Sequence, residues 1–140
     1  MKFSKSWKTY LTVLLILPVG FAAWGIAEVA RVIPSDTFLS MSEAKKMWGE
    51  SPFDAEKFRN GDESVRASMA VSILKNPKIF MGKTPLELRE ILGTPTGFYH
   101  FDMNPAYIVS ESDKPDGDTW QLLFLIDRHY KIKSVKIHKN

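Results

Sequence analysis

An apolar stretch without charge is the first pattern along the chain and covers 19 residues, from Thr9 to Ala27. As a helix with about 1.5 Å of rise per residue, it spans roughly 28 Å, the thickness of a membrane's hydrocarbon core. Three lysines precede it, and only Arg31 closely follows it. The positive-inside rule then predicts that residues 9–27 cross the inner membrane once, with the N-terminus in the cytoplasm and the remainder in the periplasm.

The same stretch can be interpreted as a cleaved signal peptide. Leu11–Leu17 is then the apolar region, Pro18 and Gly20 interrupt the helix, and small residues such as Ala27 provide a cleavage site. The mature protein would be secreted to the periplasm. A buried core helix is a third interpretation, which the lysine flank and the terminal position disfavour. In the first two interpretations, residues 1–33 are an anchor or signal segment separate from the folded domain.

Residues 34–61 are predicted to form a linker that contains one short helix. Pro34 disfavours helix at the residue before it, and the serine and aspartate that follow favour a turn. Ser42–Trp48 has a helical composition, with a cap at Ser40 or at its own first residue. The folded domain is therefore expected to occupy residues 62–140.

The first helix of this domain is predicted from the spacing of its apolar positions. Val65, Met69 and Ile73 recur every four residues and would form the buried face of a helix over residues 62–75. Acidic side chains at its start and Lys75 at its end suit the helix dipole.

A second helix is predicted mainly from its ends. Thr84 is a suitable N-cap, Pro85 a suitable first residue, Glu87 completes a capping box and Gly93 stops the helix. The expected inner stripe consists of Leu88, Ile91 and Leu92.

From residue 98 onward the pattern changes to alternation with aromatic and β-branched residues, which predicts a sheet. The expected strands are Phe98–Phe101, Tyr107–Val109, Trp120–Ile126 and Ile132–Ile137. Asp127–Lys131 would be the turn between the last two. In the final strand, Val135 and Ile137 are expected to face inward, and Lys136 and His138 outward.

Composition and charge exclude several classes of function. The formal charge is +3, but four of the 19 basic and one of the 16 acidic residues precede residue 34, which leaves 15 of each in the remainder. A neutral domain is not expected to bind nucleic acid. The chain has no cysteine, which excludes thiol nucleophiles, disulfides and the acylated cysteine of a lipoprotein.

No motif of catalysis or metal binding is present in the sequence. His100, His129 and His138 lack the spacing of a metal site, and His129 and His138 are expected at the surface. Neither a Gly-x-Ser-x-Gly elbow nor a Gly-rich phosphate loop occurs. We therefore expect a protein that is not an enzyme and has neither cofactor nor metal.

Two groups of residues are candidates for binding. One face of a strand cannot bury four successive rings, so part of the aromatic run is expected at the surface, where a partner would bind. The candidate partner-binding residues are Phe98, Tyr99, His100, Phe101 and Trp120. A run of cations on the last hairpin could contact anionic lipid or could protect an edge strand from pairing. Its members are Arg128, Lys131, Lys133 and Lys136.

The order of these signals resembles a known family. Phe80-Met-Gly-Lys-Thr84, a capped helix ending in Ile91-Leu-Gly-Thr-Pro95, and strands that include Trp120–Asp127 are similar to the SmpA/OmlA family, the BamE-like small lipoproteins of outer-membrane assembly. The resemblance covers about residues 62–138. The chain departs from the family in lacking the lipid-bearing cysteine and in having Lys83 where the family has an apolar residue.

The resemblance implies an α+β fold in which two helices pack on one face of a three-stranded antiparallel sheet. It also implies a non-enzymatic interaction or scaffold domain of the bacterial envelope, whose partners are envelope proteins. β-Lactamase-inhibitor-like domains have the same arrangement of elements. The alternative function is therefore a proteinaceous inhibitor or immunity protein that acts on an envelope enzyme.

Overall fold

A computed structural model describes residues 37–100, 103–111 and 117–140. Four α-helices, one short 3-10 helix and four strands lie within these residues. In chain order they are β1 (Thr37–Leu39), α2 (Met41–Trp48), α3 (Ala55–Asn60), α4 (Glu63–Lys75), η1 (Pro77–Ile79), α5 (Pro85–Leu92), β2 (Ala106–Ser110), β3 (Trp120–Ile126) and β4 (Ile132–Lys139).

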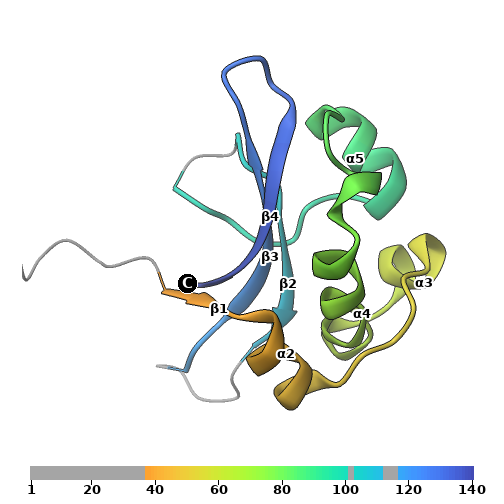
Figure 1. Cartoon of the computed structure of the whole chain (residues 1–140), viewed down its shortest axis with the longest axis vertical. Coiled ribbons are helices and arrows are strands. Elements are labelled where there is room, and N and C mark those ends of the chain that lie inside the picture. Colours follow the sequence, from red (N-terminus) through yellow and green to blue (C-terminus); the bar gives the residue numbers. More distant parts are fainter. Residues whose placement is uncertain (1–36, 101–102, 112–116) are drawn as a thin grey trace, which may run out of the picture. The chain divides into compact units, whose positions relative to one another are not determined.

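The strands form one antiparallel sheet in the order β1-β4-β3-β2, and the helices gather on one of its faces (Figure 1). The α+β class is as expected, but the sheet has a fourth strand and the helical layer has additional members. Both additions come from residues 37–60, which the sequence placed in a linker with one short helix. That helix is confirmed as α2, capped by Ser40, whereas β1 and α3 were not predicted. Thr37 pairs with Lys139, and Ala44 and Phe58 are completely buried. The part of the expected linker from residue 37 on therefore belongs to the folded domain.

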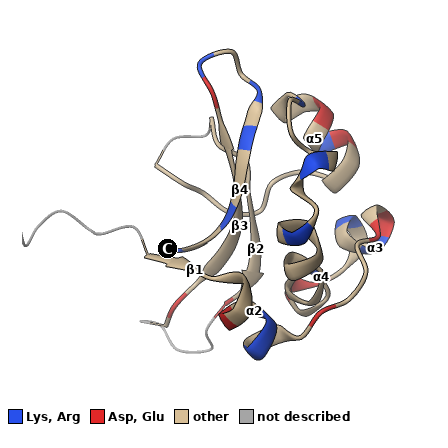
Figure 2. Ribbon diagram, viewed as in Figure 1, with Lys and Arg blue, Asp and Glu red and all other residues tan. Residues whose placement is uncertain are grey.

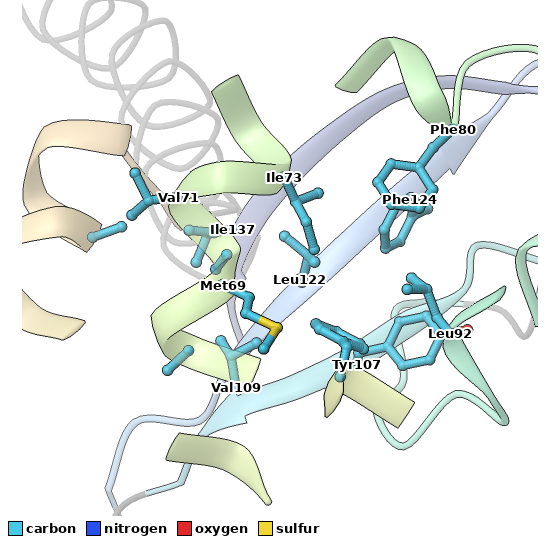
Figure 3. Packing of buried hydrophobic residues seen from close by; sticks show 14 of the residues in the cluster. Met69, Val71, Ile73, Phe80, Leu92, Tyr107, Val109, Leu122, Phe124 and Ile137 are labelled. Atoms are coloured by element: carbon cyan, nitrogen blue, oxygen red, sulfur yellow. The ribbon is translucent and has the colours of Figure 1, made fainter. Parts of the chain in front are cut away.

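The core between helices and sheet is rich in aromatic rings (Figure 3). Tyr107 of β2 packs edge-on against Phe124 of β3 and Phe58 of α3, with ring centroids 5.9 and 5.7 Å apart. Phe80 packs against Phe124 in the same way at 5.3 Å. These contacts join α3, the segment after η1 and two strands, so the one buried ring of α3 connects this short helix to the core.

Helix α4 agrees with its predicted boundaries and is capped by Asp62. Met69 and Ile73 are buried as expected, and Val65 is half-buried against the core. Ala67, Ala70 and Val71 are buried as well, because α2 packs on a second side of α4. The four-residue spacing identified one buried face but did not show that a second helix covers another.

Helix α5 confirms the predicted capping box. The Thr84 hydroxyl accepts from the Glu87 backbone N–H at 3.2 Å, and the Glu87 carboxylate accepts from the Thr84 backbone N–H at 2.7 Å. At the other end, the Arg59 guanidinium donates to the carbonyls of Glu90 and Ile91 at 2.9 and 3.0 Å. Arg59, which is distant in sequence, thus satisfies two carbonyls that the helix itself leaves without partners.

The C-terminal hairpin follows the prediction in its strands and turn, and differs at one histidine. The Asp127–Lys131 turn joins β3 to β4, with Val135 half-buried against the core and Ile137 buried within it. His138, expected at the surface, is only 5% exposed. It does lie on the sheet face opposite Ile137, but that face is also covered.

Within the described residues, no helix has both the length and the apolar character to cross a membrane. The predicted span of residues 9–27 lies outside them, as does the whole segment 1–33.

Candidate interaction surface

The segment after α5 crosses to the sheet face away from the helices, where Gln121 of β3 binds it (Figure 1). The Gln121 Oε1 accepts from the Phe98 backbone N–H at 3.1 Å, and its Nε2 donates to the Phe98 carbonyl at 2.7 Å. One side chain therefore makes the two hydrogen bonds that a neighbouring strand would make. We call residues 97–100 the aromatic segment.

The aromatic segment replaces the strand that the sequence predicts at Phe98–Phe101. Residues 98–100 are irregular, and Phe101 lies outside the described residues. His100 has a positive φ of 47°, which a strand does not accommodate. The run of aromatic residues predicted a strand. The Phe98 backbone instead forms its hydrogen bonds with the side chain of Gln121, and no described strand pairs with it.

The aromatic segment and β1 together cover His138. The ring centroid of Tyr99 lies 4.7 Å from that of His138 and the centroid of Phe38 lies 5.6 Å from it. Gln121 Nε2 is 3.2 Å from His138 Nδ1. Gln121 is 1% exposed, so amide and imidazole form a buried polar pair under the aromatic rings. The segment is thereby fixed in position on the sheet.

Part of this fixed segment remains exposed. Phe98 is 52% exposed although its backbone is bound on both sides. Leu86 of α5 is 67% exposed and Met103 is 53% exposed. Leu86 and Phe98 line one groove, and exposed apolar side chains that lie together are typical of binding sites.

A groove lies between α5 and the aromatic segment, with a volume of about 460 Å³. Leu86 and Arg89 line it on the α5 side, and Phe98, Tyr99 and Asn104 on the other. Three prolines supply much of the remaining lining. Because proline has no backbone N–H, the backbone offers few hydrogen-bond donors to the groove. The groove is therefore mixed in character, with polar and apolar surface in similar amounts.

The predicted partner-binding residues do not all lie together. Phe98 and Tyr99 line the groove, and His100 is exposed at the end of the aromatic segment. Trp120 lies on the opposite face of the sheet, where its ring centroid is 6.5 Å from that of Trp48 and it packs against the core. Trp120 is therefore not part of the groove surface, because Trp120 and Gln121 are adjacent in β3 and so face opposite ways. Contact of Trp120 with a partner stays a prediction.

The four predicted cations, Arg128, Lys131, Lys133 and Lys136, are all exposed along β4 and its turn (Figure 2). Backbone N–H bonds from Lys131 and His129 hold the pKa of the Asp127 carboxyl below its ordinary value, so this acid serves the turn itself. Lys136 Nζ lies 4.6 Å from the centroid of the Phe38 ring. Contact of these cations with anionic lipid stays a prediction.

Three residues of this surface were not found from the sequence. Leu86 and Arg89 lie in a helix for which the sequence predicted only the buried stripe. Their three-residue spacing places them together on another face of that helix. Gln121 had a usable signal, because it is the one polar residue in the apolar strand Trp120–Ile126. A buried amide needs hydrogen-bond partners, which predicts a backbone segment nearby.

Comparisons with known protein families, with curated proteins and with solved structures give no match. Among the residues that the structure describes, no group of three His, Asp or Glu side chains could hold a metal ion. The groove and the aromatic segment are accordingly the basis for inferring function.

Proposed function

We propose that this protein is a non-enzymatic interaction domain of the bacterial envelope, held at the inner membrane by residues 9–27 or secreted to the periplasm, and BamE-like in its role. The partner is an envelope protein that binds over the groove and the aromatic segment. The observation that carries the proposal is the exposure of Phe98 on a backbone that Gln121 fixes from both sides. An ordered apolar surface loses little conformational entropy on binding, which favours complex formation.

The order of elements supports the BamE-like part of the proposal. From α4 to β4, two α-helices precede a meander of three antiparallel strands, β2, β3 and β4. This is the arrangement that the resemblance implied for residues 62–138. The elements β1, α2 and α3 extend it at the N-terminal side.

The uncharged segment Thr9–Ala27 and its lysine flank support the location. Protein sequencing by mass spectrometry of membrane and soluble envelope fractions tests this part by itself. An intact N-terminus in membranes indicates an anchor, and a mature start near Glu28 in the soluble fraction indicates secretion. Finding the chain only in the cytoplasm would exclude both.

Site-directed photo-crosslinking tests the interaction. A photoreactive phenylalanine analogue is placed at position 98 or 86 of the full chain in its own cells, and at position 57 as a matched control. Lys57 is exposed on α3, among the helices and not at the groove. We expect the same envelope protein to be captured from positions 98 and 86 and not from 57.

Two outcomes would alter this conclusion. If positions 98 and 86 capture nothing beyond what position 57 captures, the surface is not an interaction site. If both capture a hydrolase whose activity falls in the complex, the inhibitor alternative is correct.

A further inference from the structure

The charge of the groove indicates what kind of partner segment it binds. Arg89 is the one charged side chain among the described residues that line the groove. It forms no ion pair with any described carboxylate. The carboxylate of Glu87, two residues earlier, is bound to the Thr84 backbone N–H and hydroxyl. The guanidinium is thus a cation at the groove with no compensating acid among the described residues.

A second polar group stands on the opposite wall. The Asn104 Oδ1 accepts from the Ile126 backbone N–H at 3.0 Å, which fixes the side chain. Its NH₂ group makes no hydrogen bond within the described part of the chain. Both Arg89 and Asn104 can donate, so the two walls offer donors to an acceptor-bearing ligand.

The apolar part of the surface indicates a chain and not a compact molecule. Leu86 and Phe98 line the groove and remain more than half exposed, and Met103 extends the apolar surface beside Asn104 in the chain. A ligand confined to the groove would contact Leu86 and Phe98 but not Met103, which is not part of the lining. An extended peptide can cover them while one of its groups lies in the groove.

Resting on the proposed function, we propose that the groove binds an apolar peptide segment of the partner through a carboxylate that pairs with Arg89. The carboxylate is either the C-terminus of the partner or an acidic side chain within the segment. Arg is suited to this role because its planar fork binds both carboxylate oxygens. Asn104 donates to a peptide carbonyl, and Leu86 and Phe98 contact the apolar side chains.

Fluorescence anisotropy with the full chain in lipid nanodiscs tests the proposal, with empty nanodiscs as the blank. Three labelled five-residue peptides of alanine, leucine and phenylalanine are compared. The first ends in a free carboxylate, the second in an amide, and the third in an amide with one internal glutamate. We expect the first or the third to bind roughly tenfold more tightly than the second. Which of the two binds more tightly identifies the source of the carboxylate.

Variants assign the effect to the groove. Arg89→Gln is expected to abolish the preference for a carboxylate, and Arg128→Gln, an exposed cation on the hairpin turn, to retain it. Leu86→Ser should weaken all three peptides, and its folding can be verified by circular dichroism because Leu86 is exposed.

Equal binding of the three peptides, no binding of any of them, or an unchanged preference in Arg89→Gln would each overturn the proposal. Binding of dodecanoate without binding of any peptide would also overturn it, in favour of a lipid. If crosslinking from position 98 still captures an envelope protein in these cases, the interaction function stands and only the carboxylate chemistry is wrong.

Discussion

Gln121 and Phe98, 23 positions apart in the chain, are joined by two hydrogen bonds between one side-chain amide and both backbone groups of a single residue. The amide thus makes the two hydrogen bonds that a residue of a neighbouring strand would make. Gln121 also contacts His138 of β4, so the aromatic segment, β3 and β4 are connected through one buried side chain. The predictions below begin with this residue.

Replacing Gln121 with alanine should destabilise the domain and release the aromatic segment. Two hydrogen bonds are lost and the Phe98 N–H and carbonyl lose their partners, which corresponds to about 2–3 kcal/mol in the free energy of unfolding. Urea denaturation measures this loss, and hydrogen exchange should accelerate at Phe98. Gln121→Glu retains an acceptor for the Phe98 N–H, but it places a buried carboxylate against the Phe98 carbonyl and should be destabilised at least as much. Equal exchange at Phe98 in the wild type and Gln121→Ala would contradict the assignment.

Gly97 is predicted to tolerate no side chain because of the same amide. A Cβ at Gly97 would overlap Gln121 Oε1 and lie 3.3 Å from the Ala106 Cβ. Gly97→Ala should therefore cost about 1–3 kcal/mol in the wild type. In the Gln121→Ala background the main clash is absent, so the cost should fall by more than half. Additive losses in this double-mutant cycle would show that the clash lies elsewhere.

Tyr107 should stabilise the folded domain through its hydroxyl group as well as through its ring. The hydroxyl donates to the Gly93 carbonyl at 2.9 Å, just past the end of α5. Burial raises the pKa of this phenol well above its ordinary value, so the donor stays protonated under all ordinary conditions. Tyr107→Phe keeps the ring and should lower the free energy of unfolding by about 1 kcal/mol. Tyr130→Phe, whose ring is 59% exposed, is the matched control and should leave stability unchanged.

The capping box of α5 should make stability depend on pH. Hydrogen bonds from the Thr84 N–H and hydroxyl hold the pKa of Glu87 below its ordinary value of 4.5. Its stabilising effect is therefore present above that value and is lost as the pH falls through the lowered pKa. The difference in stability between wild type and Glu87→Gln should be largest near neutral pH and smallest at about pH 3.

Glu90→Gln serves as the control for this pH dependence, because Glu90 is exposed on the same helix and its carboxylate bonds no described backbone amide. Its stability relative to wild type should change little over the same pH range. A pH dependence as large as that of Glu87→Gln would mean that the net charge of α5, and not the capping box, causes the effect.

Removing the Thr84 side chain should weaken the start of α5 directly. Thr84→Ala deletes the N-cap oxygen that accepts from the Glu87 N–H and should cost about 1 kcal/mol. Thr84→Ser keeps that oxygen and should restore most of the loss. Chemical denaturation of the three proteins at neutral pH measures both changes.

Elements determined by neighbouring residues could be predicted from the sequence, and elements determined by distant partners could not. The capping box from Thr84 to Glu87 spans four residues and the turn from Asp127 to Lys131 spans five, so both are visible as local patterns. β1 has three residues, too few to show a period, and exists because β4 pairs with it. α3 depends on Phe58, whose aromatic contacts lie as far away as Tyr107.

The binding surface was predicted in part for the same reason. Four successive large residues indicated that some of Phe98–Phe101 would be exposed, and Phe98 is. Gln121, the one polar residue in the apolar strand Trp120–Ile126, could have separated Trp120 from that surface, because adjacent residues of a strand face opposite ways. His138 was assigned to the correct face, but its burial depends on Tyr99 and Phe38, which the spacing within β4 cannot show.

The sheet order has a consequence for when the domain can fold. β4 comes last in chain order among the four strands but lies between β1 and β3. Until residues 132–139 have left the ribosome, β1 has no strand to pair with and β3 has only β2. The long-range pairs that close the sheet therefore form only after synthesis of this region is finished.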